Sequence, residues 1–311
     1  MMHLRITSPP EQTRRVVELL DDCVGVANVA TIPGASVRPV GDLVLADVVR
    51  ESVEEIIRSL QGLGIDASGT ITLESIDTAV SEAAERAEEA APGASADAVI
   101  WEEVVGRTEA DAILSTTFVC FLSLAAMLAA IAVVLDSSIL VVGAMVVGPE
   151  FGPLAAIAVG LVHRRFGMIR QSLTTLAVGV SAAVAVATAA ALLAEGVGWI
   201  DGSVLDQPRP LTGFIWTPDR WSFVVAFVAG IAGTLSLTMA KSGALVGVFI
   251  SVTTVPAIGN FSLALALWQP REMAGSAAQL GINVVAIILA GVLTLLVQKG
   301  AARSVRSVAR A

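Results

Sequence analysis

A single carboxylate stands in the middle of a long apolar segment, among two prolines and two glycines. The segment Ser137–His163 has the run Gly148-Pro149-Glu150-Phe151-Gly152-Pro153 at its centre. Proline removes a backbone donor and clashes with the preceding turn, so one continuous helix is excluded there. The apolar pieces on either side have eleven residues each. Together they are long enough to cross a hydrocarbon core of about 30 Å, which predicts a membrane span broken near its middle.

The chemistry expected at this break follows from its depth. Charge is costly inside a membrane, and unwound backbone is tolerated there only where it is buried in protein or lines a cavity. We therefore expect a solute site built on the break. Glu150 would couple protons or cations to transport, or pair with an amine on the solute. A structural hydrogen bond to a facing Ser or Thr is the alternative role for Glu150.

A second break is expected about one hundred residues later. Ser138–Gly143 (SILVVG) can be aligned with Ser242–Gly247 (SGALVG) at an offset of 104 residues. Each of these runs precedes an interruption that contains proline, and the second interruption is Thr253–Asn260. The repeat unit then has three spans, so the second copy must be inverted in the membrane. Inverted repeats with a discontinuous helix in each half are typical of secondary transporters.

The two breaks are expected to face each other across one cavity. A broken helix leaves N–H groups unpaired at the start of its second half, where an anionic group binds favourably. Pro153 and Pro256 suit the first position of such halves. The predicted solute-binding residues are Gly148, Pro149, Glu150, Phe151, Gly152, Pro153, Ser251, Thr253, Thr254, Pro256 and Asn260. Kinks that serve helix packing alone are the alternative. Gln279 and Asn283 could line the same cavity, but polarity that serves helix packing is the favoured interpretation for each.

Composition places the chain among membrane proteins with a soluble part. Hydrophobic residues make up 55% of the sequence and charged residues 15%, and the mean hydropathy is +0.79. Residues 1–111 contain 8 Arg and 21 acidic residues, whereas residues 112–311 contain 11 basic and 7 acidic residues. We expect a soluble domain over 1–77, an acidic linker over 78–111 that can form an interfacial helix around Trp101, a transmembrane domain over 112–298 and a basic tail over 299–311.

Stretches with strand and helix patterns alternate in the first 77 residues. The expected strands are His3–Ser8, Val26–Arg38, Asp42–Arg50 and Gly69–Ile76, and the expected helices are Pro9–Cys23 and Glu51–Leu63. The order βαββαβ predicts an α+β domain of the ferredoxin-like kind. Such a domain can serve as an assembly module or as a ligand sensor, and its fold alone does not choose between them.

Six membrane spans are expected in the α-helical body. They are Ala112–Leu135, Ser137–His163, Met168–Ala194, Trp221–Ala240, Ser242–Trp268 and Ser276–Gln298. If the N-terminal domain is cytoplasmic, the segments on that side contain eight basic residues and those on the other side contain three. This imbalance follows the positive-inside rule, and four tryptophans gather at the outer side as an aromatic belt would. The prediction is a polytopic protein of the inner (cell) membrane, with a 3+3 inverted repeat and both termini in the cytoplasm.

Other classes of site find no support in the sequence. Cys23 and Cys120 provide no disulfide framework, and the chain has two histidines, so no metal site is expected. A nucleophile–base set is missing as well, so we expect neither an enzyme nor a cofactor. The expected partners are the lipid bilayer, a small solute or ion, and further copies of the chain in a homo-oligomer. Nucleic acid is not an expected partner.

The first broken span resembles a known family signature. The run SSILVVGAMVVGPEFGPLAAIAVGL is similar to that of the membrane proteins grouped as domain-of-unknown-function family 389, also described as an uncharacterized hydrophobic domain. The residues that match the pattern are Ala144, Met145, Pro149, Gly152 and Pro153. Glu150 stands where an apolar residue is expected in many relatives. The resemblance extends from Ala112 to about Gln298 and implies a multi-spanning bacterial membrane protein without an established substrate.

The function predicted from these features is secondary transport. A small polar or anionic solute would bind at mid-membrane between the two proline-broken helices. A channel that uses the same polar midplane is one alternative. A membrane-anchored sensor or assembly scaffold is another. The breaks argue against a simple anchor, because an anchor gains nothing from unwinding inside the membrane.

Overall fold

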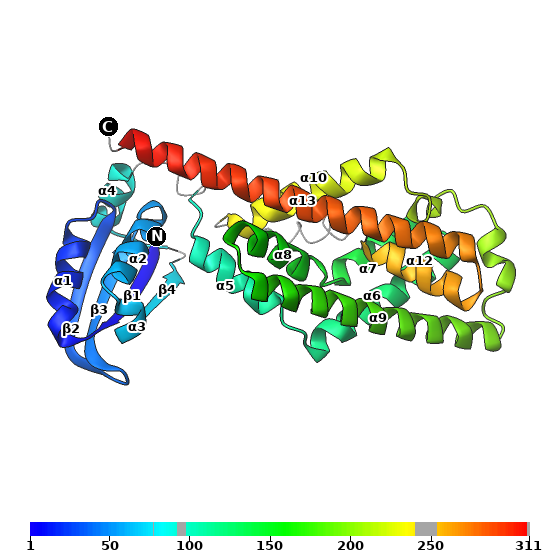
Figure 1. The fold of residues 1–311 in the computed structure, drawn as a ribbon, viewed down its shortest axis with the longest axis horizontal. Coiled ribbons are helices and arrows are strands. Elements are labelled where there is room, and N and C mark those ends of the chain that lie inside the picture. Colours follow the sequence, from blue (N-terminus) through cyan, green and yellow to red (C-terminus); the bar gives the residue numbers. More distant parts are fainter. Residues whose placement is uncertain (77, 92–97, 240–253, 310–311) are drawn as a thin grey trace. The chain divides into compact units, whose positions relative to one another are not determined.

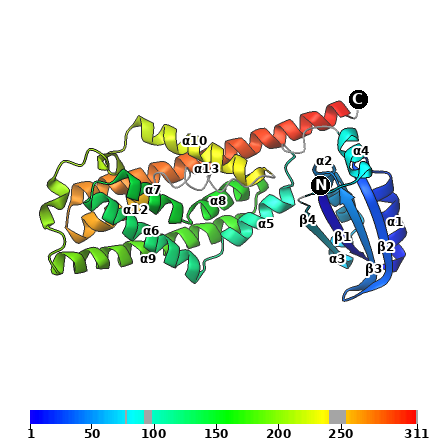
Figure 2. The ribbon, with the colours of Figure 1, turned by 180° about the vertical axis from the view of Figure 1, so that it is seen from behind.

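The computed structural model describes residues 1–76, 78–91, 98–239 and 254–309 (Figures 1 and 2). The chain divides into two compact units. One consists of Met1–Glu102 with Gly300–Ala311, and the other of Glu103–Lys299. The first unit contains the β-sheet, and the second contains the long apolar helices.

The first unit is built on a four-stranded antiparallel sheet with the strand order β2-β3-β1-β4. Its elements are β1 (Met2–Ser8), α1 (Pro10–Asp21), β2 (Val26–Val37), β3 (Val40–Val48), α2 (Arg50–Gly62), α3 (Ile65–Ser68) and β4 (Thr70–Ser75). Every strand and helix expected in this part of the sequence is present, with bounds within two residues of the prediction. The short helix α3 is added to the expected βαββαβ order.

One face of this sheet forms the core of the first unit. In the β1–β3 register Leu4 is opposite Ala46 and Ile6 is opposite Val44, and all four side chains are buried. Because side chains alternate along a strand, these residues share one face. The two main helices cover that face with Val16, Leu20, Val53, Ile56, Ile57 and Leu60. Apolar residues at helical spacing in α1 and α2 account for this packing.

The segment predicted as a linker contains a helix. This helix, α4 (Glu82–Ala90), begins after Ser81, whose Oγ accepts a hydrogen bond from the N–H of Ala83. Ala87 packs with Val49, so α4 belongs to the first unit. The next helix is α5 (Trp101–Asp111), and Trp101 is buried. A buried tryptophan favours packing within the protein over insertion into a membrane surface.

The second unit is a body of apolar helices. Its elements are α6 (Thr116–Val134), α7 (Ser138–Val147), α8 (Phe151–His163), α9 (Phe166–Gly196), η2 (Gly202–Asp206), η3 (Gly213–Ile215), α10 (Arg220–Thr238), α12 (Thr254–Ala266) and α13 (Pro270–Ala309). Among the described residues, α6, α9, α10 and α13 are long and apolar enough to cross a membrane, and the bent pair α7–α8 would make a fifth span. In both views α7, α8 and α12 lie between α9 and α13 (Figures 1 and 2).

Five of the six predicted spans correspond to these helices. The remaining one, Ser242–Trp268, is described only over α12, because residues 242–253 lie outside the described part of the chain. The prediction of six spans can therefore be compared with the structure only in part. The segment predicted as a basic tail is helical through residue 309, as the continuation of α13.

The predicted break in the second span is present. Helices α7 and α8 meet at an angle of 57° across residues 148–150. Pro153 lies two residues later than expected, because α8 begins at Phe151 and Pro153 is its third residue. The prediction for Pro256 is not tested, because the residues before Thr254 lie outside the described part of the chain. Proline fits throughout the first turn, since the N–H groups of that turn have no acceptor within the helix.

Helix boundaries in the body recur after 104 residues. Helices α6 and α10 have 19 residues each, and both their starts and their ends are 104 residues apart. The starts of α9 and α13 are also 104 residues apart. Helices α8 and α12 end at His163 and Ala266, which are 103 residues apart. The offset first indicated by the short run Ser138–Gly143 thus reappears in the helix boundaries.

The ends of these helices repeat in their chemistry as well. Ser115 caps α6 by accepting a hydrogen bond from the N–H of Phe118, and Asp219 caps α10 through the N–H of Ser222. Arg164 and Trp268 follow α8 and α12, and both have a positive φ, 57° and 51°. The members of each pair are 104 residues apart. Such left-handed residues end helices and are uncommon outside glycine, so their recurrence is a specific signal.

Candidate solute site

Glu150 and Thr254 are in contact at the start of α8. Thr254 Oγ1 donates a hydrogen bond of 2.5 Å to Glu150 Oε1. The exposed fractions of the two residues are 3% and 1%. Glu150 precedes the first residue of α8, and Thr254 is the first described residue of α12. The break between α7 and α8 is therefore in direct contact with the segment predicted as the second break.

The position of Glu150 suits a negative charge. It is the N-cap residue of α8, yet its side chain makes no capping hydrogen bond to that helix. The carboxylate instead reaches across to Thr254, at the first described residue of α12. Unpaired N–H groups and the helix macrodipole make each helix N-terminus favourable for an anion. Glu150 thus lies at the start of α8 and against the first described turn of α12, inside an apolar body.

A second carboxylate lies against the first turn of α8. A Cβ placed on Gly152 would be 2.7 Å from Cβ and 3.4 Å from Oδ2 of Asp111, the last residue of α5. Only glycine permits this approach without a shift of the neighbouring side chain. Burial raises the pKa of the Asp111 carboxyl, and the Arg107 guanidinium opposes that rise. Gly152 therefore brings α5 close to the break.

Asn260 belongs to a different polar cluster. Its Nδ2 donates hydrogen bonds to Ser276 Oγ at 2.8 Å and to Glu272 Oε2 at 3.1 Å. Its Oδ1 accepts a hydrogen bond of 3.2 Å from Arg209, which also forms an ion pair with Glu272. Asn260 and Ser276 are fully buried. The structure therefore separates Asn260 from the Glu150–Thr254 pair.

The Arg209–Glu272 ion pair is not among the predicted site residues. Both residues follow the pattern of exposed charges outside the spans, but their side chains are 6% and 7% exposed in the structure. The sequence offers one local signal, since Arg209 stands between two prolines in Pro208-Arg209-Pro210. Two prolines restrict the backbone around the charge. They do not reveal its partner.

The other predicted site residues have structural surroundings of their own. Gly148 ends α7, and its N–H donates to the carbonyl of Met145 at 3.3 Å. Phe151 packs against the cluster of Leu154, Ala226, Ala286 and Ile287. Pro149 is half-buried in the break, Pro153 and Pro256 are buried in the first described turns of their helices, and Ser251 and Thr253 lie outside the described residues. Of the predicted set, the structure joins Glu150 to Thr254 by a direct hydrogen bond.

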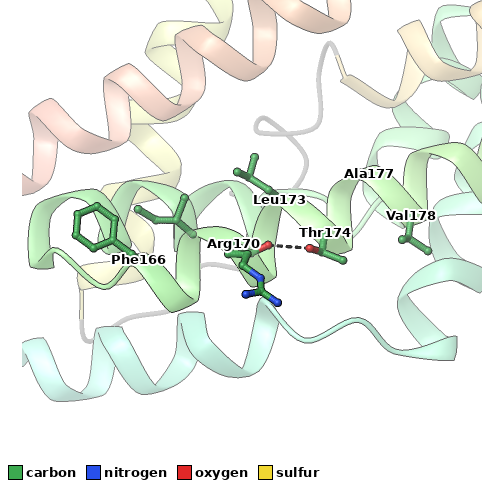
Figure 3. A pocket seen from close by; sticks show the side chains of 7 residues that line it. Phe166, Arg170, Leu173, Thr174, Ala177 and Val178 are labelled. Atoms are coloured by element: carbon green, nitrogen blue, oxygen red, sulfur yellow. Dashed lines mark hydrogen bonds between the residues drawn. The ribbon is translucent and has the colours of Figure 1, made fainter.

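An apolar hollow lies along one face of α9 (Figure 3). It is lined by Phe166, Ile169, Arg170, Leu173, Thr174, Ala177 and Val178. The hydroxyl of Thr174 is satisfied within the helix by the carbonyl of Arg170, at 2.9 Å. None of these lining residues belongs to the predicted site, and the hollow lacks the convergent polar groups that orient a solute. We do not assign it to the solute.

The helices and the buried pair define the class of protein. Several helices of the second unit are long and apolar enough to span a membrane, and one bent pair carries a buried carboxylate at its bend. In the part of the chain that the structure describes, no cluster of three or more His, Cys, Asp or Glu residues could hold a metal ion. These features are those of a polytopic α-helical membrane protein.

Comparison with known proteins supports the resemblance to one family. Residues 145–289 match the family model described as Domain of unknown function (DUF389), which confirms the resemblance found in the sequence. An uncharacterized protein of Methanocaldococcus jannaschii is 26% identical over 194 residues, which cover 62% of this chain and 58% of that protein. The chain thus spans less than two thirds of the length of this relative. No solved structure matches the chain.

Proposed function

We propose that this protein is a secondary transporter of a small polar or anionic solute and that Glu150 couples transport to protons. The observation that carries the proposal is the buried hydrogen bond between Glu150 and Thr254. A carboxylate in the interior of a membrane body is costly, and such groups mark ion pathways and proton relays. An anchor or scaffold would gain nothing from this cost.

We interpret the body as two inverted three-span repeats. The recurrence of helix starts and caps after 104 residues supports this interpretation. Glu150 and Thr254 are themselves 104 residues apart. In two copies related by a two-fold axis, a residue on the axis contacts its own equivalent, so the pair would lie on that axis. Transporters of this architecture bind solute at the interface of the repeats, near the bilayer midplane.

Close packing of each short helix on the opposite repeat agrees with this interpretation. A Cβ on Gly259 of α12 would lie 2.5 Å from Cβ of Ala129 in α6. A Cβ on Gly291 of α13 would lie 2.9 Å from Cβ of Ala158 in α8. Helix α12 of the second repeat thus packs against α6 of the first repeat, and α8 of the first repeat packs against α13 of the second. Small residues at such contacts are typical of helix association in membranes.

Proton coupling is the role that suits Glu150 in this arrangement. Moving a net charge through an apolar core is costly. Protonation of Glu150 together with binding of an anionic solute would keep the charge of the site unchanged during the crossing. The hydroxyl of Thr254 can donate to the carboxylate or accept from the carboxylic acid, so it serves both protonation states.

The proposal is tested by solute-driven proton flux. We expect proteoliposomes loaded with the pH-sensitive dye pyranine to report proton flux when one of a panel of phosphate, short carboxylates and small amines is added. Glu150→Gln keeps the shape of the side chain but cannot ionise, so the flux should fall at least about tenfold, the equivalent of ~1.4 kcal/mol. Glu195→Gln, at an exposed carboxylate near the end of α9, is the matched control and should leave the flux unchanged.

Two results would count against this function. Equal flux in the Glu150→Gln and wild-type proteins would show that Glu150 is structural. A large electrical current that needs no solute gradient would favour a channel over a transporter.

We also propose that the N-terminal domain faces the cytoplasm, on the basis of the uneven distribution of basic residues. In a chain with both native cysteines replaced by Ser, a cysteine at Gly202 should react with an impermeant thiol reagent added to intact cells. A cysteine at Val37, which is 86% exposed in the first unit, should react only after the membrane is permeabilised. The opposite pattern would reverse the orientation.

A further inference from the structure

We propose that a polar pathway follows one face of α13 to the Glu150–Thr254 pair, and that the Arg209–Glu272 ion pair closes its entrance. The pathway would take small solutes that carry O–H or N–H donors. This inference rests on the proposed transport function, because it describes how solute reaches the central pair.

A stripe of polar residues defines the pathway on α13. Glu272, Ser276, Gln279 and Asn283 are spaced by four, three and four residues, so they share one face of the helix. Their exposed fractions are 6% or less. A polar stripe in a membrane helix that avoids the lipid faces the interior of the body, where such residues mark solute or ion pathways.

The equivalent face of α9 lacks this character. Positions 104 residues earlier carry Met168, Ser172, Thr175 and Gly179. The Ser172 hydroxyl donates to the carbonyl of Met168 at 2.9 Å, and the Thr175 hydroxyl donates to the carbonyl of Ala112 at 2.7 Å. Both hydroxyls are therefore occupied by backbone acceptors. The polar stripe is specific to one half of the body, which makes general helix packing an insufficient explanation.

The stripe leads toward the central pair. Asn260 bonds to Glu272 and Ser276, so α12 lies beside the start of the stripe. Thr254 is six residues before Asn260, or about 9 Å along α12 at 1.5 Å per residue. Asn283 is seven residues beyond Ser276, or about 10 Å along α13. Helix α13 begins four residues after α12 ends, and Leu280 packs against the cluster that contains Val255. The stripe therefore reaches the level of the first described turn of α12.

Gln279 has an unused acceptor in the middle of the stripe. Its Nε2 donates to Asn283 Oδ1 at 3.3 Å, while its Oε1 is buried and has no hydrogen-bond partner among the described residues. Buried polar atoms are nearly always satisfied in folded proteins. An acceptor that is left open along a polar stripe fits a passing O–H or N–H group, which is the basis for the proposed class of solute.

The segment 202–215 closes the start of the stripe. Arg209 holds it to Glu272 and Asn260. A second attachment is made by Asp136, which accepts hydrogen bonds from the Thr212 hydroxyl at 2.8 Å and the Leu211 N–H at 3.1 Å. An unpaired guanidinium is costly in an apolar interior. If Glu272 lost its charge, Arg209 would move to water and take the segment with it.

Thiol labelling tests the closure. Gln279→Cys in a chain without native cysteines is reconstituted in lipid nanodiscs, where both faces are open to solvent, and is treated with a trimethylammonium methanethiosulfonate reagent. We expect slow labelling with the attachments intact. Glu272→Gln should raise the labelling rate at least about tenfold. The Asp136→Ala substitution should also raise the labelling rate, because it removes the second attachment of the segment 202–215 and leaves no unpaired buried charge.

Thr175→Cys provides the matched control. It occupies the equivalent position on α9, so it should stay unreactive in both backgrounds. Unchanged labelling at position 279 in folded Asp136→Ala protein would overturn the proposal, whether or not Glu272→Gln folds. An equal rise at position 175 would indicate general loosening and would overturn it as well. The experiment uses no solute, so its outcome is independent of whether proton flux is found.

Discussion

Exchanging the two residues of the central pair is expected to keep a transport activity that either single substitution removes. Glu150→Thr deletes the carboxylate, so solute-driven proton flux should fall at least about tenfold. Thr254→Glu alone sets two carboxylates within hydrogen-bond distance, and like charges so close suppress the ionisation of one of them. The double variant has one carboxylate and one hydroxyl in contact, each in the place of the other.

The physical reason is the equivalence of the two positions. Glu150 precedes the first residue of α8, Thr254 is the first described residue of α12, and the two are 104 residues apart. If a two-fold axis passes between them, a carboxylate on either side has the same access to both faces of the body. We therefore expect the flux of the double variant to be within about threefold of wild type. The effects of the two substitutions would then be non-additive, as is usual for residues in contact.

The measurement is the pyranine assay on matched amounts of folded protein. Flux that is lost in both single variants and recovered in the double variant would support both the coupling role of the carboxylate and the inverted repeat. A double variant that folds but is as inactive as Glu150→Thr would contradict the two-fold interpretation. The loss in Glu150→Gln would then still stand as evidence for Glu150.

Features that depend on local chemistry could be predicted from the sequence. The alternation that buries Leu4 and Ile6 defines β1, and the prolines and glycines around Glu150 define the break. The prediction of a linker over 78–111 misses α4, although Ala and Glu are strong helix formers. Its N-cap, Ser81, is the signal that could have revealed it.

Features that depend on distant contacts could not be predicted in the same way. The sequence predicts Asn260 beside Glu150 because Asn260 belongs to the segment expected to be the second break, but six residues of helix separate it from Thr254 by about 9 Å along α12. Arg209 and Glu272 were placed outside the membrane because hydropathy counts each charge alone. Only the fold shows that the two charges are buried together.

Removing one partner of the Arg209–Glu272 pair is expected to be strongly destabilising. Arg209→Met leaves the Glu272 carboxylate buried without its counter-charge, which should lower the free energy of unfolding by about 3–5 kcal/mol. The measurement is unfolding in detergent followed by tryptophan fluorescence. The matched control is Arg14→Met, which breaks the exposed Arg14–Glu18 pair on α1 and should cost about 0–1 kcal/mol.

The double variant Arg209→Met/Glu272→Met decides what the pair contributes. Replacing both charges with apolar side chains of similar length removes the desolvation cost along with the attraction, so stability should return to within about 1 kcal/mol of wild type or exceed it. A single variant no worse than Arg14→Met would show that the pair is open to water and that the segment 202–215 does not close the stripe. Loss in the single variant with recovery in the double variant would mean that the pair adds little net stability while it is closed. A contact of that kind can open at low cost, as the entrance of a transport pathway must.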